Sequence, residues 1–192
     1  MPRTKQFDPE DVLRKAVEAF WDNGYAKTSL DTLIAEMGIA RQSLYDTFGD
    51  KRALYLRALA HYRDANHAAL RRLFDSGQSV RQCFTELLAG LCSESKSARR
   101  RGCLLLSANL ERERDDEEIA KLLKDNQAAI ETIFERALRR AQASGELSAD
   151  RDPRALARFF VTTIQGMRAF ARVDTSSKSM EQVAAVALTA LD

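Results

Sequence analysis

The feature that most constrains the fold is a pair of short helical patterns that meet at Gly38. Thr28-Ser29 offers hydroxyl N-caps, and the apolar residues that follow predict a helix over residues 30–37. Gly38 stands where a helix C-cap takes a positive φ, which glycine adopts without a steric penalty. A second short helix is predicted over residues 41–48. The chain therefore contains two helices joined by a tight turn.

The second of these helices is polar over most of its surface. Only Leu44 and Phe48, spaced i and i+4, are clear core residues. Arg, Gln, Ser and Thr side chains on such a helix reach base edges when the helix lies in the major groove of DNA. We therefore predict a helix-turn-helix that binds DNA, with an ordinary helical hairpin as the alternative. The predicted DNA contacts are Thr28, Ser29, Arg41, Gln42, Ser43, Tyr45, Thr47 and Lys51.

The stretch G-I-A-R-Q-S-L-Y-D-T-F-G-D-K-R-A-L resembles the signature of the tetracycline-repressor (TetR) family, and the resemblance covers about residues 8–59. Thr47 departs from the pattern, because the family more often has His or Tyr there, and the resemblance implies an altered phosphate contact at this position. The resemblance implies an all-α transcriptional regulator, most often a repressor, that binds a DNA operator. The matching positions are Ala16, Phe20, Gly24, Tyr25, Thr28, Leu33, Ala35, Gly38, Ile39, Ala40, Ser43, Leu44, Tyr45, Phe48, Lys51 and Leu54.

The net charge does not by itself indicate a nucleic-acid partner. The 192 residues carry a formal net charge of +2, and residues 1–60 contain nine basic and nine acidic side chains. Phosphate affinity would have to come from the placement of these charges, from helix N-termini and from hydroxyl groups. The polar arm at residues 1–7 carries Arg3 and Lys5, and we interpret it as a frayed terminus, with a contact to DNA as the alternative.

The composition favours a helical protein of the reducing cytoplasm. The chain is 45% hydrophobic and has only three prolines and eight glycines. No apolar run approaches the roughly 18 residues of a membrane span, and the N-terminus is too polar for a secretory signal. Cys83, Cys92 and Cys103 lack the spacing of metal ligands. We therefore expect no membrane partner, no metal and no cofactor.

About nine helices are expected along the chain, which makes the fold all-α, and the first three are expected to form the DNA-binding unit with the helix-turn-helix. Asp8-Pro9 and Asp152-Pro153 are typical helix starts, and Asp50 is the predicted cap of a long helix. The Ser-x-x-Gln pattern at Ser179 predicts a capping box at the start of the last helix. The arginine-rich stretch at residues 93–101 is interpreted as a solvated loop.

The domain organisation follows from these elements. Residues 1–50 are expected to form the DNA-binding domain, and residues 51–192 the ligand-binding and dimerisation domain, with the helix over residues 51–75 as the link. Residues 111–118 are mostly acidic and are interpreted as a solvated segment, in which Asp115 or Asp116 caps the next helix.

The last two helices are the expected homodimer interface. The helix after Pro153 is apolar on more than one face, and the last helix is rich in small residues. Two copies would form a four-helix bundle and would place two reading helices about 34 Å apart, as a palindromic operator requires. A monomer that buries these faces is the alternative. The predicted interface residues, which the family resemblance also implies, are Phe159, Thr162, Gly166, Phe170, Val183, Val186, Ala187 and Ala190.

A pocket for a small-molecule effector is expected among the helices after residue 79. They carry much apolar surface and a few polar groups, as small-molecule sites do, and the resemblance implies an inducer there. Effector binding would favour a conformation with wrongly spaced DNA-reading units, which relieves repression. The predicted pocket residues are Phe84, Leu88, Cys103, Leu106, Asn109, Gln127, Phe134, Phe160, Ile164 and Met167.

Two further readings remain open, and enzymatic activity is not among them. The sequence contains no phosphate-binding glycine loop, no G-x-S-x-G and no H-E-x-x-H motif. The first alternative is a thiol sensor, in which oxidation of Cys103, or of Cys92 with Cys83, replaces the ligand. Buried thiols are usually inert packing groups. The second is a helical module that binds protein and not DNA.

Overall fold

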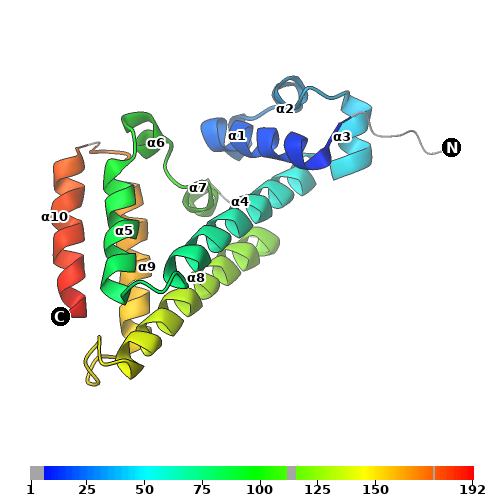
Figure 1. Ribbon diagram of the computed structural model, residues 1–192. Helices are drawn as coiled ribbons and strands as arrows, with labels where there is room; N and C mark the ends of the chain where they lie inside the picture. The colour runs from blue at the N-terminus through cyan, green and yellow to red at the C-terminus, as the bar shows by residue number, and fades with distance from the viewer. Residues whose placement is uncertain (1–6, 112–115, 175) are drawn as a thin grey trace. The chain divides into compact units, whose positions relative to one another are not determined.

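The computed structural model describes residues 7–111, 116–174 and 176–192 (Figure 1). The regular structure of these residues is helical throughout, which confirms the expected fold class. Arg3, Lys5 and Asp115 lie outside the described residues, and no helix of the described part is long and apolar enough to cross a membrane. The elements are α1 (Pro9–Lys27), α2 (Leu30–Met37), α3 (Arg41–Phe48), α4 (Lys51–Phe74), α5 (Val80–Ser93), α6 (Lys96–Arg101), α7 (Leu104–Glu111), α8 (Glu117–Ala143), α9 (Pro153–Phe170), α10 (Ser177–Leu188) and the 3-10 helix η1 (Thr189–Leu191).

The chain forms two compact units. The first combines the chain up to Ala65 with Cys103–Leu122, and the second combines Asn66–Gly102 with Leu123–Asp192. Helices α4 and α8 contribute residues to both units, and α7 belongs to the first. The assignment of domains at residues 1–50 and 51–192 stays a prediction.

Local capping groups begin several helices where the sequence predicts them. Asp8, Asp50 and Asp152 each accept a hydrogen bond from a backbone N–H in the first turn of α1, α4 and α9, at 2.9, 2.7 and 2.9 Å. Such caps satisfy donors that have no partner within the helix. Asp116 does the same for α8, since it accepts a bond from the backbone N–H of Ile119 at 3.1 Å.

Two predictions about local structure are wrong. The arginine-rich stretch is not a loop throughout, because Lys96–Arg101 form α6 with the Ser95 hydroxyl as its cap. The last helix begins at Ser177 and not at Ser179. The Ser179 hydroxyl donates to the Asp174 carboxylate at 3.0 Å, so it forms no capping box.

The core of the first unit holds α3 in place. Phe20, Leu33, Leu44 and Leu54 are completely buried, and Phe48 is nearly so. Helix α3 has eight residues, too few to be stable alone in water. Burial of a Leu or Phe side chain contributes about 1.5–3 kcal/mol, so Leu44 and Phe48 keep the helix folded against its neighbours.

The core of the second unit is built around phenylalanines. The rings of Phe84 and Phe160 stack with centroids 3.8 Å apart, and Phe134 meets Phe84 edge-on at 5.1 Å. Helix α10 packs against α5 and α9, as Figure 1 also shows. These rings are fully or almost fully buried, so they link α5, α8 and α9 into one apolar interior.

Candidate nucleic-acid interface

A glycine turn fixes the angle between α2 and α3. Gly38 has φ 69° and ψ 33°, and its N–H donates to the carbonyl of Ile34 at 3.0 Å. This left-handed conformation is the common helix C-cap, and a Cβ atom would destabilise it. Ile39 is buried beside the turn. The two helices therefore leave the turn in a fixed geometry, as a helix-turn-helix requires.

The outward face of α3 carries hydrogen-bonding side chains. Arg41, Gln42 and Tyr45 are exposed, whereas Ser43 and Thr47 are half-buried. Because Leu44 and Phe48 occupy the inner face, the remaining positions of this amphipathic helix point away from the core. The face can therefore offer donors and acceptors to the edges of bases.

Carboxylates hold two of these side chains. The Gln42 amide donates to Asp46 at 2.8 Å, one helical turn further along. The Arg41 guanidinium forms an ion pair with Asp31 of α2. Both pairs are exposed, so each contributes little to stability.

The N-termini of two helices, α2 and α4, lie before and after α3 in the sequence. The Ser29 hydroxyl accepts a bond from the N–H of Thr32 at 3.0 Å and caps α2. Lys51 is the first residue of α4, and its ammonium lies 4.3 Å from the centroid of the Tyr25 ring. Burial lowers the pKa of Lys51. A helix N-terminus with a lysine is a suitable place for a phosphate group.

Thr28 is a correction to the predicted contacts. Its side chain is completely buried, and its hydroxyl donates to the carbonyl of Gly24 at 2.5 Å. A hydroxyl that is enclosed by protein and bonded to the backbone is not available to DNA. Thr28 therefore stabilises the end of α1, and the remaining seven predicted contacts lie at least partly at the surface.

Acidic residues at the end of α7 and around the start of α8 make contacts that the sequence analysis did not predict. Glu111 accepts a bond from the backbone N–H of Tyr25 at 3.1 Å. Arg52, the second residue of α4, binds Asp116 at 2.9 Å and Glu118 at 2.8 Å. The predicted solvated segment is thus bonded, at its described ends, to the unit that carries α3.

These carboxylates also change the acidity of their neighbours. The Arg52 guanidinium, and then the Ile119 backbone N–H, lower the pKa of the Asp116 carboxyl. Burial, and then the charge of Glu111, raise the pKa of the Tyr55 hydroxyl. The Tyr55 ring packs against the rings of Phe20 and Tyr25, with centroids 4.8 and 4.7 Å away.

The predicted pocket residues fall into two groups. Phe84, Leu88, Phe134, Phe160, Ile164 and Met167 belong to the second unit, and their side chains pack in or against its core. In the same unit Gln127 is exposed and donates to Glu131 at 3.1 Å. Cys103, Leu106 and Asn109 belong to the first unit, where Cys103 and Leu106 are half-buried and Asn109 is exposed. The effector pocket stays a prediction.

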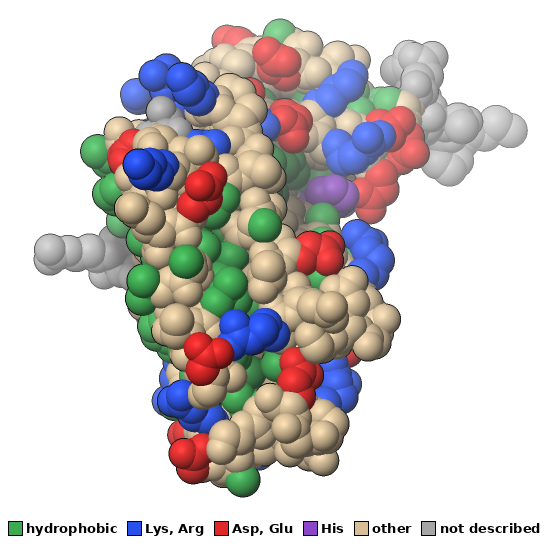
Figure 2. All heavy atoms as spheres, turned by 60° about the vertical axis from the view of Figure 1, so that its left-hand side comes forward, with side chains coloured by type: hydrophobic (Ala, Val, Ile, Leu, Met, Phe, Trp, Pro, Cys, Tyr) green, Lys and Arg blue, Asp and Glu red, His purple; other side chains and the backbone are tan. Residues whose placement is uncertain are grey.

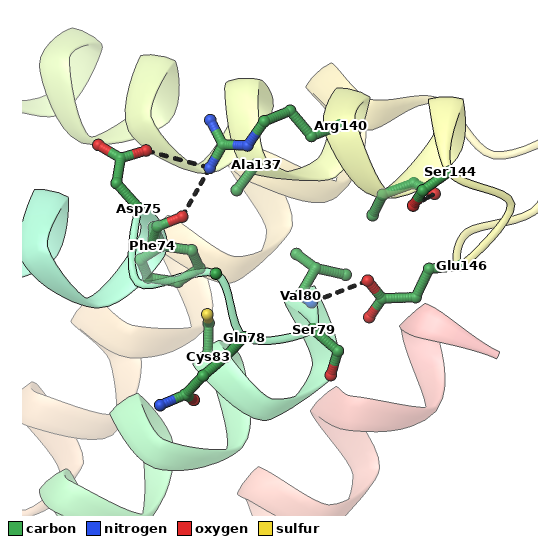
Figure 3. A pocket seen from close by; sticks show the side chains of 12 residues that line it. Phe74, Asp75, Gln78, Ser79, Val80, Cys83, Ala137, Arg140, Ser144 and Glu146 are labelled. Atoms are coloured by element: carbon green, nitrogen blue, oxygen red, sulfur yellow. Dashed lines mark hydrogen bonds and ion pairs between the residues drawn. The ribbon is translucent and has the colours of Figure 1, made fainter.

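The second unit has a cavity of about 640 Å³ between the end of α4, the start of α5 and the end of α8 (Figure 3). Its polar side chains are bonded to protein: Arg140 donates to the Phe74 carbonyl at 2.6 Å, and Glu146 accepts from the Val80 N–H at 3.0 Å. None of the predicted pocket residues lines it. Its lining residues are Phe74, Asp75, Gly77, Gln78, Ser79, Val80, Cys83, Ala137, Arg140, Ala141, Ser144 and Glu146.

Several predicted dimer residues form an exposed apolar face on α9 and α10. Phe159, Phe170, Val183 and Val186 are between 42% and 70% exposed. Figure 2, which brings the α10 side of the molecule forward, shows hydrophobic side chains running between charged ones on this side. Thr162 and Gly166 are also exposed, whereas Ala190 is half-buried and Ala187 is buried.

The three cysteines differ in exposure. Cys83 and Cys92 are buried, and burial raises the pKa of both thiols. Cys103 is half-buried at the start of α7. Within the described residues, no group of three His, Cys, Asp or Glu side chains is arranged to hold a metal ion.

Known proteins resemble the chain along its length. Residues 12–58 match the family described as "Bacterial regulatory proteins, tetR family", and residues 78–187 match "Tetracyclin repressor-like, C-terminal domain". The chain is 33% identical to the uncharacterized HTH-type transcriptional regulator YezE of Bacillus subtilis (strain 168), with 100% of both chains covered. It is also 33% identical to the HTH-type transcriptional repressor ComR of Escherichia coli (strain K12), over 97% of this chain and 90% of that one.

A solved structure has the same fold in the presence of DNA. It is a cysteine mutant of the TetR family transcriptional regulator CifR, complexed with 26-base-pair double-strand operator DNA. It is 31% identical to this chain, with a TM-score of 0.87, and the match covers 99% of this chain and 100% of that one.

Proposed function

We propose that this chain, which belongs to the TetR family and is a DNA-binding transcriptional regulator, is a repressor that binds a palindromic operator as a homodimer. A small-molecule effector then releases it from DNA. The observation that carries the proposal is the hydrogen-bonding face of α3, which is exposed because Leu44 and Phe48 bury the opposite face.

The proposed contacts divide into base readers and phosphate contacts. Gln42 carries both a donor and an acceptor, the combination that pairs with the major-groove edge of adenine, and Arg41 suits guanine. Ser29 and Lys51 stand at helix N-termini, and these positions suit phosphates. Ser43, Tyr45 and Thr47 complete the face. This placement of groups gives affinity to a segment that has no net positive charge.

The proposed dimer uses the exposed face of α9 and α10. Apolar side chains such as Phe159 and Val186 are exposed in a single copy. Their removal from water by a second copy lowers the free energy and so favours the dimer. A two-fold axis through the four helices would present two copies of α3 to half-sites one helical turn apart. The operator should therefore be palindromic.

The effector is proposed to act by population shift. One conformation of the dimer fits the operator, and in the other the two α3 helices are wrongly spaced. A ligand that binds more tightly to the second conformation lowers the affinity for the operator, and the ratio of its affinities for the two conformations limits the size of the effect. A thermal-shift screen, followed by operator release with each ligand found, would test this step.

A thiol sensor is the second candidate, and the exposure of Cys103 favours it over the other two cysteines. A thiol reacts as the thiolate, so the raised pKa of Cys83 and Cys92 makes them poor sensors. Operator binding would be titrated with hydrogen peroxide in the wild type and in Cys103→Ser. Loss of binding in the wild type alone would favour the thiol sensor, and no response in either protein would end it.

The DNA-binding proposal is tested with an operator selected from a randomised duplex library. We expect two inverted half-sites, and we expect Gln42→Ala to lose about 1–3 kcal/mol of discrimination at one base pair. Gln127→Ala is the matched control, because this exposed glutamine on α8 also bonds a carboxylate one turn along the helix. Failure to select any sequence would favour a protein-binding module, and equal base discrimination by all three proteins would refute the role of Gln42 as a base reader.

A further inference from the structure

An acidic side chain outside the helix-turn-helix holds the backbone that leads into it. Glu111, the last residue of α7, accepts a hydrogen bond from the Tyr25 N–H at 3.1 Å, across 86 positions of sequence. Tyr25 follows Gly24, where α1 leaves helical geometry with φ 76° and ψ 169°. The contact therefore joins the end of α7 to the bend near the end of α1, ahead of α2.

The fit between Glu111 and the bend is close. A Cβ atom on residue 24 would lie 2.7 and 2.8 Å from the two carboxylate oxygens of Glu111. Gly24 therefore meets two requirements, since it adopts a positive φ and leaves room for the carboxylate. The Thr28 hydroxyl holds the same bend from the other direction along the chain, through its bond to the Gly24 carbonyl.

The Tyr25 side chain extends this arrangement to a proposed phosphate contact. The Tyr25 ring packs on Tyr55 with centroids 4.7 Å apart, and the Lys51 ammonium lies 4.3 Å from the Tyr25 centroid. A cation near an aromatic face is attracted to it. Because the bonded amide and the ring belong to one residue, the bond to Glu111 restricts the position of both.

We propose that Glu111 is a positioning residue for operator binding. Its carboxylate fixes the Tyr25 backbone, and the Tyr25 ring then places the Lys51 ammonium for contact with a phosphate. The proposal rests on the proposed function, in which Lys51 contacts the DNA backbone.

A second pair of contacts supports the assignment. Arg52, next to Lys51, binds Asp116 and Glu118, which begin or precede the first turn of α8. The acidic residues on either side of positions 112–115 thus fix both the ring beside Lys51 and the residue that follows it. This segment was not expected to act on the DNA-binding helices.

Electrostatics alone predicts the opposite effect of Glu111. A carboxylate near a DNA-binding surface repels phosphates, so removal of its charge should tighten operator binding. Two substitutions separate charge from position. Glu111→Gln removes the charge and keeps an oxygen that can accept the Tyr25 N–H, whereas Glu111→Ala removes both.

The test measures operator affinity of the full-length variants at several salt concentrations. Glu111→Ala should bind about fivefold to tenfold more weakly than the wild type, because a charge-assisted hydrogen bond is lost. Glu111→Gln should bind as tightly as the wild type or more tightly. Glu117→Ala is the control for charge, since Glu117 is an exposed acid in the first turn of α8. Unchanged or tighter binding by Glu111→Ala, or equal weakening by Glu111→Gln, would overturn the proposal.

The Lys51→Ala variant tests whether Glu111 acts through Lys51. This substitution should weaken binding and lower the slope of log affinity against log salt by about 1. Glu111→Ala should then add at most about a twofold loss, since coupled residues are not additive. If Glu111→Ala instead lowers operator affinity in this background as much as it does in the wild type, Glu111 does not act through Lys51 and the proposal is overturned. If Lys51→Ala changes neither affinity nor slope while the wild type binds its operator, the phosphate contact is wrong and the role of Glu111 fails with it.

Discussion

Gly24→Ala should destabilise the first unit by about 2–4 kcal/mol. Residue 24 has φ 76° and ψ 169°, a region that non-glycine residues occupy at a cost of about 1–3 kcal/mol. The new Cβ would also lie under 3 Å from both Glu111 oxygens, so the carboxylate must move away. Loss of its bond to Tyr25 adds about 1 kcal/mol, a low value because the bond is exposed to water.

The assay is urea unfolding followed by the fluorescence of Trp21, the single tryptophan, which lies on α1 close to the bend. Gly38→Ala is the control, since residue 38 also has a positive φ but a Cβ there would meet only the Lys15 ammonium, at 3.8 Å. It should cost about 1–2 kcal/mol. In the Gly24→Ala background, Glu111→Ala should cost almost nothing more. Equal losses for the two glycine variants, or additive losses for Gly24 and Glu111, would refute the reasoning.

Three further predictions follow, one on pH and two on helix glycines. The Arg52 guanidinium lowers the pKa of Asp116 below its ordinary value of 3.8, so this carboxylate stabilises the fold above that pH and ceases to do so as pH falls through its lowered pKa. Asp116→Asn should therefore be less stable than the wild type at pH 7, and a urea-unfolding series should show the difference vanishing at low pH. Gly90→Ala, in a helix with open space around it, should stabilise the protein by about 0.5–1 kcal/mol. Gly166→Ala should instead weaken the dimer, measured by sedimentation, because α9 is proposed to lie against the partner copy. If Gly166→Ala stabilises the protein as much as Gly90→Ala does and leaves the dimer unchanged, this interface is wrong.

Signals within a few residues of one another predicted the local structure well. Asp8, Asp50 and Asp152 cap helices where their side chains can reach the first turn, because the cap interaction spans only two or three residues. Gly38 ends α2 for a similarly local reason. The apolar spacing of Leu44 and Phe48 was sufficient to orient α3 and thus to identify its polar face.

The same local pattern can form in one place and not in another. Ser79 and Gln82 make a complete capping box at the start of α5. Ser179 and Gln182 have the same spacing, but the helix already begins at Ser177, and the Asp174 carboxylate accepts the hydrogen bond of the Ser179 hydroxyl. The sequence pattern does not include this competing acceptor, which only the turn before α10 brings within reach.

Long-range contacts left no sequence signal. Tyr25 and Glu111 are 86 positions apart, and Arg52 and Asp116 are 64 apart, so no periodicity connects them. A stretch made up of charged residues alone is typical of a solvated segment, and this was the prediction for residues 111–118. Only the fold shows that its described ends are bonded to α1 and α4.

These contacts give a physical account of how a segment without net charge can serve as a DNA-binding unit. Nine acidic residues balance nine basic ones in residues 1–60, which would oppose binding if the carboxylates were free to face phosphates. Instead Asp31 pairs with Arg41, and Asp46 accepts from Gln42, so these acids hold side chains that are proposed to read bases. Asp50 caps the helix that begins with Lys51. Carboxylates thus fix the positions of the groups that are proposed to contact DNA, and in this proposal orientation takes the place of bulk positive charge.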